Sequence, residues 1–427
     1  MAVAAEAEAS PRIQEARKAV KSDPKKAESI YQEILSQKPS GTVAAFQEYE
    51  AALMGLGQTY QSQKKWNDLS SLVKSSTSSL TSFPKAKTAK IVRQLLDLFP
   101  SSDPSTTPLQ ISTTKSCIEW AISTRRSFVK QSLETRLVSL YMSQAAYYDA
   151  LSLINTLLKE LKRLDDKLVL VEVQLLESRV YSALGNIPKS RAALTSARTS
   201  AASVYTPPLL QAGLDMQSGQ LHAADGDFGT SYSYFVEALE GYQSLDEGAK
   251  ATSALQYMLL CKVMDNANQE VTQLLASKSA VKYESSSLEA MKAVATAHAN
   301  RSLEEYERAL GKYRNELGGD AFVKRHLVKL YDAMLEQNLC KVIEPFSRVE
   351  IKHVAKMVGL DIAQVERKLS QMILDKVIVG VLDQGAGCLI VYEEAERDGG
   401  YDAALETIAS LSNVVDVLYA NQASLLE

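Results

Sequence analysis

The sequence predicts an all-α solenoid of paired helices that leads into a winged helix and ends in one further helix. Apolar residues recur at helical spacing through residues 1–330 with little strand-like alternation. Polar turns return there about every 40 positions, as in helical repeat proteins. Residues 346–394 then have the order helix, turn, helix and hairpin.

The first clear helical hairpin is expected in residues 44–75. Apolar or aromatic residues of its first helix are Phe46, Tyr49, Leu53, Leu56 and Tyr60, and its second helix carries Trp66, Leu69, Leu72 and Val73. The segment from Leu56 to Tyr60 resembles the first-helix signature of tetratricopeptide repeats, in which Gly57 would admit a partner helix closely.

Similar turns recur farther along the chain and give the period. They lie around Tyr147, Ile187, Phe228 and Asn268, at intervals of 187−147 = 40, 228−187 = 41 and 268−228 = 40, and another follows at Leu303. The interval from Trp66 to Tyr147 is about two such steps, so one further turn is expected near residue 106, inside a proline-rich stretch. Paired helices at this period predict a solenoid, because a single pair cannot bury its apolar face.

The winged helix is predicted from two helices and a hairpin. Ile351, Val354, Ala355 and Val358 have helical spacing, and Gly359 is placed to end that helix. Asp361 can cap the next helix, whose expected buried stripe is Ile362, Val365, Leu369, Met372 and Ile373. Two β-branched runs, 377–382 and 388–392, flank turn residues 383–387.

Charge favours protein packing over nucleic acid for this winged helix. The 427-residue chain has 47 basic and 51 acidic residues, a net charge of −4 and a pI of about 5.8. In the second helix of the winged segment, Arg367, Lys368 and Lys376 are balanced by three acidic residues, so no basic stripe is available for phosphates.

The chemistry-bearing residues form no recognisable catalytic, metal or cofactor motif. Four cysteines are far apart and four histidines lack a nucleophile or carboxylate at catalytic spacing, so we expect no metal and no disulfide framework. A glycine pair starting at Gly55 lacks the rest of a dinucleotide fingerprint. Neither a signal peptide nor a membrane span is evident, which favours an intracellular protein that does not cross a membrane. The lack of a catalytic motif favours a protein that is not an enzyme.

A helical repeat array that runs into a neutral winged helix resembles the PCI domain. The resemblance is carried by "PFSRVEIKHVAKMVGLDIAQVERKLSQMILDKVIVGVLDQG", and upstream by "CIEWAISTRRSFVKQSLETRLVSLY" and "ALQYMLLCKVMDN". It implies a non-catalytic scaffold subunit of the proteasome lid, in the cytoplasm and nucleus. The implied partners of this hetero-oligomer are other PCI subunits, the proteasomal ATPase ring and the α-ring of the core particle; no cofactor, nucleic acid or membrane is implied.

Three regions and two contact surfaces are expected. The regions are a solenoid arm at 1–300, a PCI region at 301–395 with its winged helix at 346–394, and a linker with a C-terminal bundle helix at 396–427. Both wing strands are expected to offer an edge to a neighbouring sheet, with Val379, Val381, Leu389 and Val391 as contact residues. A helix at 402–422 is expected to offer an apolar seam of Leu405, Ile408, Leu411, Val415 and Leu418, either to a bundle of helices from other subunits or to its own winged helix.

Two alternatives to the proteasome lid stay open. PCI subunits also occur in the COP9 signalosome and in a translation initiation factor complex, and copurifying partners would distinguish these from the lid. A winged helix that binds nucleic acid would instead show binding that weakens steeply with salt.

Overall fold

The computed structural model describes residues 13, 15–16, 23–36, 43–79, 85–100, 105–164, 166–283, 285–392 and 399–423. These residues divide between two compact units, Met1–Leu288 and Glu289–Glu427, which are described separately. No helix in the described part of the chain is long and apolar enough to cross a membrane.

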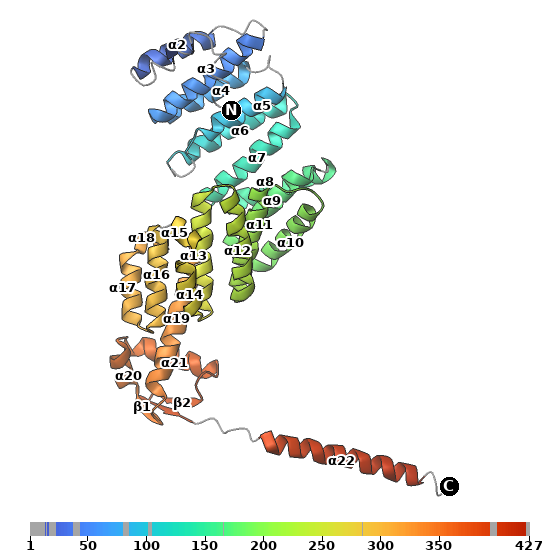
Figure 1. The fold of residues 1–427 in the computed structure, drawn as a ribbon, viewed down its shortest axis with the longest axis vertical. Helices are drawn as coiled ribbons and strands as arrows, with labels where there is room; N and C mark the ends of the chain where they lie inside the picture. Colours follow the sequence, from blue (N-terminus) through green and yellow to red (C-terminus); the bar gives the residue numbers. More distant parts are fainter. Residues whose placement is uncertain are drawn as a thin grey trace. The chain divides into compact units, whose positions relative to one another are not determined.

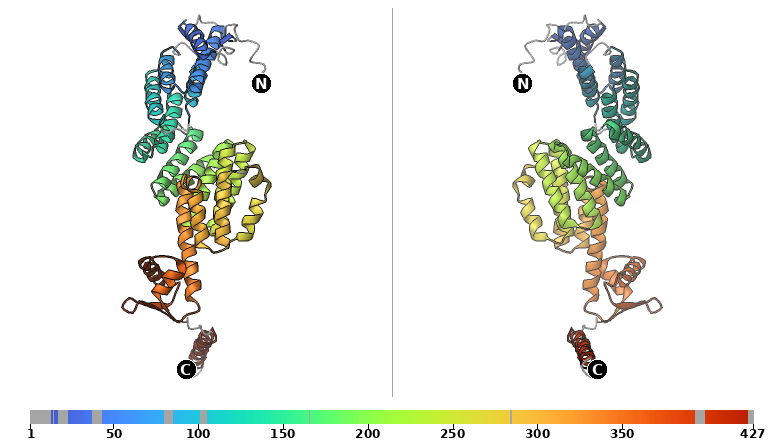
Figure 2. Two further views of the ribbon diagram at one scale, coloured as in Figure 1. Left: turned by 90° about the vertical axis from the view of Figure 1, so that its left-hand side faces the viewer. Right: turned by 90° about the vertical axis from the view of Figure 1, so that its right-hand side faces the viewer.

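The first unit is a stack of helices (Figure 1). It contains α2 (Pro24–Ser36), α3 (Val43–Ser62), α4 (Trp66–Ser79), α5 (Lys85–Asp97), α6 (Thr107–Ser123), α7 (Ser127–Ser143), α8 (Tyr147–Leu164), α9 (Lys167–Ala183), α10 (Ile187–Ala202), α11 (Pro208–Asp225), α12 (Phe228–Ser244), α13 (Gly248–Met264), α14 (Asn268–Leu275) and α15 (Lys278–Lys282). Helix α12 packs against both α11 and α13, and the three helices lie side by side in both views of Figure 2. The predicted solenoid is confirmed.

The first residues of the second helices recur with the expected period of about 40 residues. The second helices of successive pairs begin at Trp66, Thr107, Tyr147, Ile187, Phe228 and Asn268, so the turn expected near residue 106 falls at the start of α6. In each of the short turns before α4, α8, α10, α12 and α14, the residue two positions before the new helix is in the left-handed backbone region. Only two of these five are glycines, Gly185 and Gly226.

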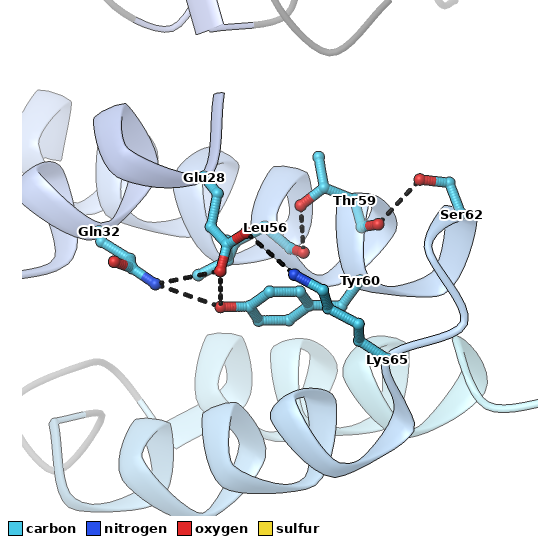
Figure 3. A network of polar contacts seen from close by, with 7 residues as sticks. All are labelled: Glu28, Gln32, Leu56, Thr59, Tyr60, Ser62 and Lys65. Atoms are coloured by element: carbon cyan, nitrogen blue, oxygen red, sulfur yellow. Dashed lines mark hydrogen bonds and ion pairs between the residues drawn. The ribbon is translucent and has the colours of Figure 1, made fainter. Parts of the chain in front are cut away.

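Close packing at glycine and one polar network join the first helices. The missing side chain of Gly57 lets the end of α5 approach, since a Cβ there would lie 3.3 Å from Leu95 Cδ2 of α5 and 2.5 Å from Cδ1 of Leu98, the residue after this helix. Figure 3 shows that the Tyr60 hydroxyl donates to Glu28 Oε1 at 3.2 Å and accepts from Gln32 Nε2 at 3.3 Å. Lys65 Nζ lies 3.4 Å from the other Glu28 oxygen. Gly57 therefore has the close-packing role that the sequence predicts.

Helix α16 (Ser286–Ala299) spans the boundary between the units, and the second unit continues with α17 (Leu303–Lys312), α18 (Arg314–Gly318) and the long α19 (Ala321–Ile343). The winged helix follows as β1 (Arg348–Glu350), α20 (Ile351–Val358), α21 (Ile362–Leu374), β2 (Gly380–Asp383) and β3 (Cys388–Val391). The last element is α22 (Gly399–Ala423). Strand β1 was not expected from the sequence. The first wing strand was expected to begin at Val377, but the Val377 N–H instead donates to the Met372 carbonyl at the end of α21.

Candidate protein-interaction surfaces

The winged helix shares one hydrophobic core with the last helix of the repeat array. Leu335, Leu339 and Ile343 of α19 pack with Val349 of β1 and Leu389 of β3. The buried faces of α20 and α21 complete this core. Gly359 ends α20 in the left-handed conformation, as expected, whereas Asp361 stands at the N-cap of α21 without a side-chain capping bond. The shared core holds the winged helix on α19.

Only one of the two hairpin strands lies at an edge of the sheet, whereas the sequence suggested that both would. The strand order is β1-β3-β2, with β3 antiparallel to both neighbours. The backbone of β3 is therefore paired on both sides and cannot accept another strand. This corrects the expectation for Leu389 and Val391, which belong to the central strand. Of the hairpin, only β2, with Val381, lies at an edge.

The faces of the sheet differ in exposure. Leu389 is fully buried in the core and Val391 packs half-buried against it. Val381 lies opposite Ile390, and the Val379 carbonyl accepts a bond from the Tyr392 N–H, so these four residues share the other face. On that face Val379, Val381 and Tyr392 are 40%, 51% and 53% exposed. The contact surface that we call the wing face is therefore Val379, Val381, Ile390 and Tyr392, of which Ile390 and Tyr392 were not found from the sequence.

Helix α21 turns one of its positive charges inward, although Arg367 stays exposed. Its Lys368 forms an ion pair with Glu336 of α19 at 2.8 Å, and only 10% of the Lys368 side chain is exposed. The outer side of α21 instead exposes Leu374 and Ile362. Ile362 was expected in the buried stripe, but it lies in the first turn of the helix and faces solvent. A positive charge turned inward and aliphatic groups turned outward favour a protein partner.

Helix α22 leaves its apolar seam uncovered. Each residue of the seam is between 50% and 66% exposed, and all the other described side chains of α22 are exposed as well. The residues concerned are Leu405, Ile408, Leu411, Val415 and Leu418. The helix begins at Gly399, three residues before the expected start at residue 402, and residues 393–398 lie outside the described part. A lone amphipathic helix of this kind gains stability mainly by packing on other helices.

The groups considered for catalysis lie apart within the described ranges. Cys117, Cys261 and Cys388 are buried, Cys340 is half-buried, and all four are free thiols. Burial raises the pKa of the Cys117 and Cys261 thiols to about 11, which keeps them unreactive. The described residues contain no group of three or more histidine, cysteine or acidic side chains that could hold a metal ion. Gly55 lies within α3 against the Tyr31 ring and not in a phosphate-binding loop.

Three family models match parts of this chain. The model for the 26S proteasome regulatory subunit RPN6 N-terminal domain matches residues 9–144, the PCI domain matches residues 310–393, and the 26S proteasome subunit RPN6 C-terminal helix domain matches residues 397–423. The last two matches cover the winged helix and α22.

Relatives match over almost the whole chain. The "Probable 26S proteasome regulatory subunit rpn6" of Schizosaccharomyces pombe is 53% identical over 96% of this chain and 98% of its own length. The "26S proteasome non-ATPase regulatory subunit 11 homolog" of Arabidopsis thaliana is 46% identical over 96% and 97%, and the "26S proteasome regulatory subunit RPN6" of Saccharomyces cerevisiae is 43% identical over 96% and 97%.

Proposed function

Because this chain belongs to the RPN6 family of 26S proteasome regulatory subunits, we propose that it is a non-catalytic scaffold of the regulatory particle lid in the cytoplasm and nucleus. In this role it supports ubiquitin-dependent protein degradation by holding other subunits together. The observation that carries the proposal is the pair of uncovered apolar surfaces in the second unit, the wing face and the seam of α22.

The two surfaces have different functions in this proposal. The wing face and the β2 edge join a neighbouring PCI subunit, because an exposed strand edge pairs readily with another chain. The seam of α22 joins a bundle of helices from several subunits, because an apolar stripe at this spacing packs on similar helices. Both contacts bury aliphatic side chains that the isolated chain leaves in water.

The first unit serves as the arm that bridges the lid to the ATPase ring and to the α-ring of the core particle. Its support is the stacked-helix architecture, which presents a long surface to partners. Large side chains stand out from it, among them Tyr148 and Tyr205, which are 80% and 83% exposed. Residues of this kind are common at protein interfaces, where they supply contact area at low entropic cost.

Native mass spectrometry of the complex that contains the tagged chain tests the proposal. We expect lid subunits with PCI domains, the ATPases and the core particle. Cross-linking of the same sample should join the second unit to PCI subunits and the first unit to the ATPase and α-rings. Recovery of signalosome or initiation factor subunits in place of proteasome subunits would assign the chain to a sister complex. Cross-links from the first unit to lid subunits alone would remove the bridging role.

A further inference from the structure

A groove runs along one side of the first unit, and none of the proposed lid contacts uses it. It consists of two adjoining cavities of about 520 Å³ and 720 Å³. Ser139, Val169 and Glu172 line both, so the two cavities are continuous. The lining side chains come chiefly from the first helices of successive pairs, α7, α9, α11 and α13.

The 40-residue period places equivalent side chains in a row along this groove. Phe128, Leu168 and Leu209 are the second residues of α7, α9 and α11, and all three line it. They are 68%, 40% and 42% exposed. Because equivalent positions of stacked repeats lie side by side, these residues form an apolar row at the mouth of the groove. We call Phe128, Leu168 and Leu209 the apolar row.

A guanidinium without a partner lies in the wall of the groove. Arg179 of α9 reaches the surface of α11 beside Gly213, where a Cβ would lie 3.3 Å from its Nη2 atom. Burial lowers the pKa of Arg179. Within the part of the chain that the structure describes, no hydrogen bond or ion pair of this guanidinium is found. Its electrostatic neighbour is Tyr242, whose phenol carries no charge at neutral pH and whose own pKa is raised by burial.

Arg179 is half-buried, and a partly desolvated charge without a counter-ion is costly to the fold, so its presence indicates a ligand that supplies the counter-charge. The other cation of the larger cavity, Lys250, lies near Glu247 at 3.7 Å. The one carboxylate among the residues lining the larger cavity is Glu172. Its pKa is raised by burial, and Arg93 of the smaller cavity acts in the opposite direction. Arg179 is therefore the charge that the groove leaves without a counter-ion.

We propose that this groove binds an extended acidic peptide segment of a partner protein, with a carboxylate on Arg179 and aliphatic side chains on the apolar row. A carboxylate matches the planar donors of a guanidinium and can accept two hydrogen bonds from it. An extended segment places alternate side chains on opposite sides, so acidic and apolar residues can face different walls. The proposal is independent of which complex the chain joins.

Fluorescence anisotropy on the full-length chain tests the proposal with two labelled peptides. One is Leu-Asp-Leu-Glu-Leu-Asp-Leu, and the other replaces each acid by its amide, which removes the charge at nearly constant shape. We expect the acidic peptide to bind at least about tenfold more tightly than the amide peptide. Arg179→Met should bring the two affinities together. Arg198→Met is the matched control, because Arg198 is an exposed arginine of α10 that lies outside the groove lining and bonds to the Tyr234 hydroxyl at 2.9 Å.

Thermal unfolding of the same variants separates binding from a structural role. If the role of Arg179 is to bind a ligand, the Arg179→Met variant should unfold at the temperature of the wild type or above it, because a half-buried charge without a counter-ion has been removed. The proposal would be overturned if the two peptides bound equally or if neither bound. It would also be overturned if the Arg179→Met variant still preferred the acidic peptide. A fall in unfolding temperature greater than that of Arg198→Met would overturn it too, because the guanidinium would then be stabilising the fold itself.

Discussion

Changing Ile408 and Val415 of α22 to aspartate should abolish assembly while leaving the chain folded. The two side chains are seven residues apart, so they lie on one side of the helix. They are 64% and 56% exposed, and neither is buried against the rest of the chain. Exposed substitutions usually change the free energy of unfolding by no more than about 0.5 kcal/mol. The folded state of the isolated chain should therefore be almost unaffected.

The loss of association can be worked out from the same exposures. Full burial of a valine or isoleucine contributes about 1.5–3 kcal/mol, and these side chains have somewhat more than half of their surface left to bury. Losing both removes roughly 2–4 kcal/mol of association free energy. Placing two unpaired carboxylates in the seam adds at least about 2 kcal/mol more. A total of about 4 kcal/mol or more weakens the complex roughly a thousandfold.

Affinity purification and native mass spectrometry measure the assembly, and thermal unfolding measures the fold. The control is Ser410→Asp with Val417→Asp, which adds the same two charges at the same spacing on the opposite face of α22. The control should assemble like the wild type. If the Ile408 and Val415 variant assembled normally, or if the isolated variant were destabilised by several kcal/mol, the reasoning about a shared bundle would be wrong.

Three further changes test other parts of the structure. Val381→Lys adds a charge to the wing face at a strand edge, so unfolding should be unchanged while incorporation into the complex falls at least about tenfold; normal incorporation would mean that this face stays in solvent. Burial, opposed by Lys130 and aided by Glu160, raises the pKa of Glu134 from 4.5 to about 7, so the native state binds the extra proton and stability falls as pH rises through that window. Glu134→Gln should therefore gain up to about 3 kcal/mol relative to wild type between pH 5 and pH 8 in denaturant unfolding, and a gain independent of pH would contradict this origin. Gly380→Ala would press a Cβ onto the Ile390 carbonyl oxygen and should cost about 1–3 kcal/mol of stability, whereas Gly385→Ala, whose Cβ meets only Asp383 Oδ1 at 3.4 Å, should be nearly neutral.

The solenoid could be predicted from the sequence because its information is local. Each turn residue and each apolar position lies within a few residues of the helix that it specifies, and the same pattern returns after about 40 residues. The turns expected at Tyr147, Ile187, Phe228 and Asn268 are helix starts in the structure. Residue Ile362 was misassigned because helical spacing alone does not show which side of a first turn meets the core.

The wing and the groove could not be predicted in the same way. Strand β1 has only three residues, and it is a strand because Arg348, Val349 and Glu350 pair with β3 some forty positions away. The order β1-β3-β2, which decides where the edge lies, depends on that pairing. Arg179 lacks a counter-ion because the other helices that line the larger cavity place no free carboxylate beside it, and no spacing along the chain predicts that arrangement.

The short turns between paired helices decide where this chain can change length. Residues 63–65, 144–146 and 184–186 connect their helices with three residues each, whereas nine residues, 98–106, connect α5 to α6. One residue inserted near the start of a second helix would rotate that helix by about 100° and turn its buried side chains toward water. The longer connection can absorb added residues at a small entropic cost. Related chains should therefore differ in length there and keep the three-residue turns unchanged, and a label or tag inserted at this connection should disturb the stack less than one inserted at a three-residue turn.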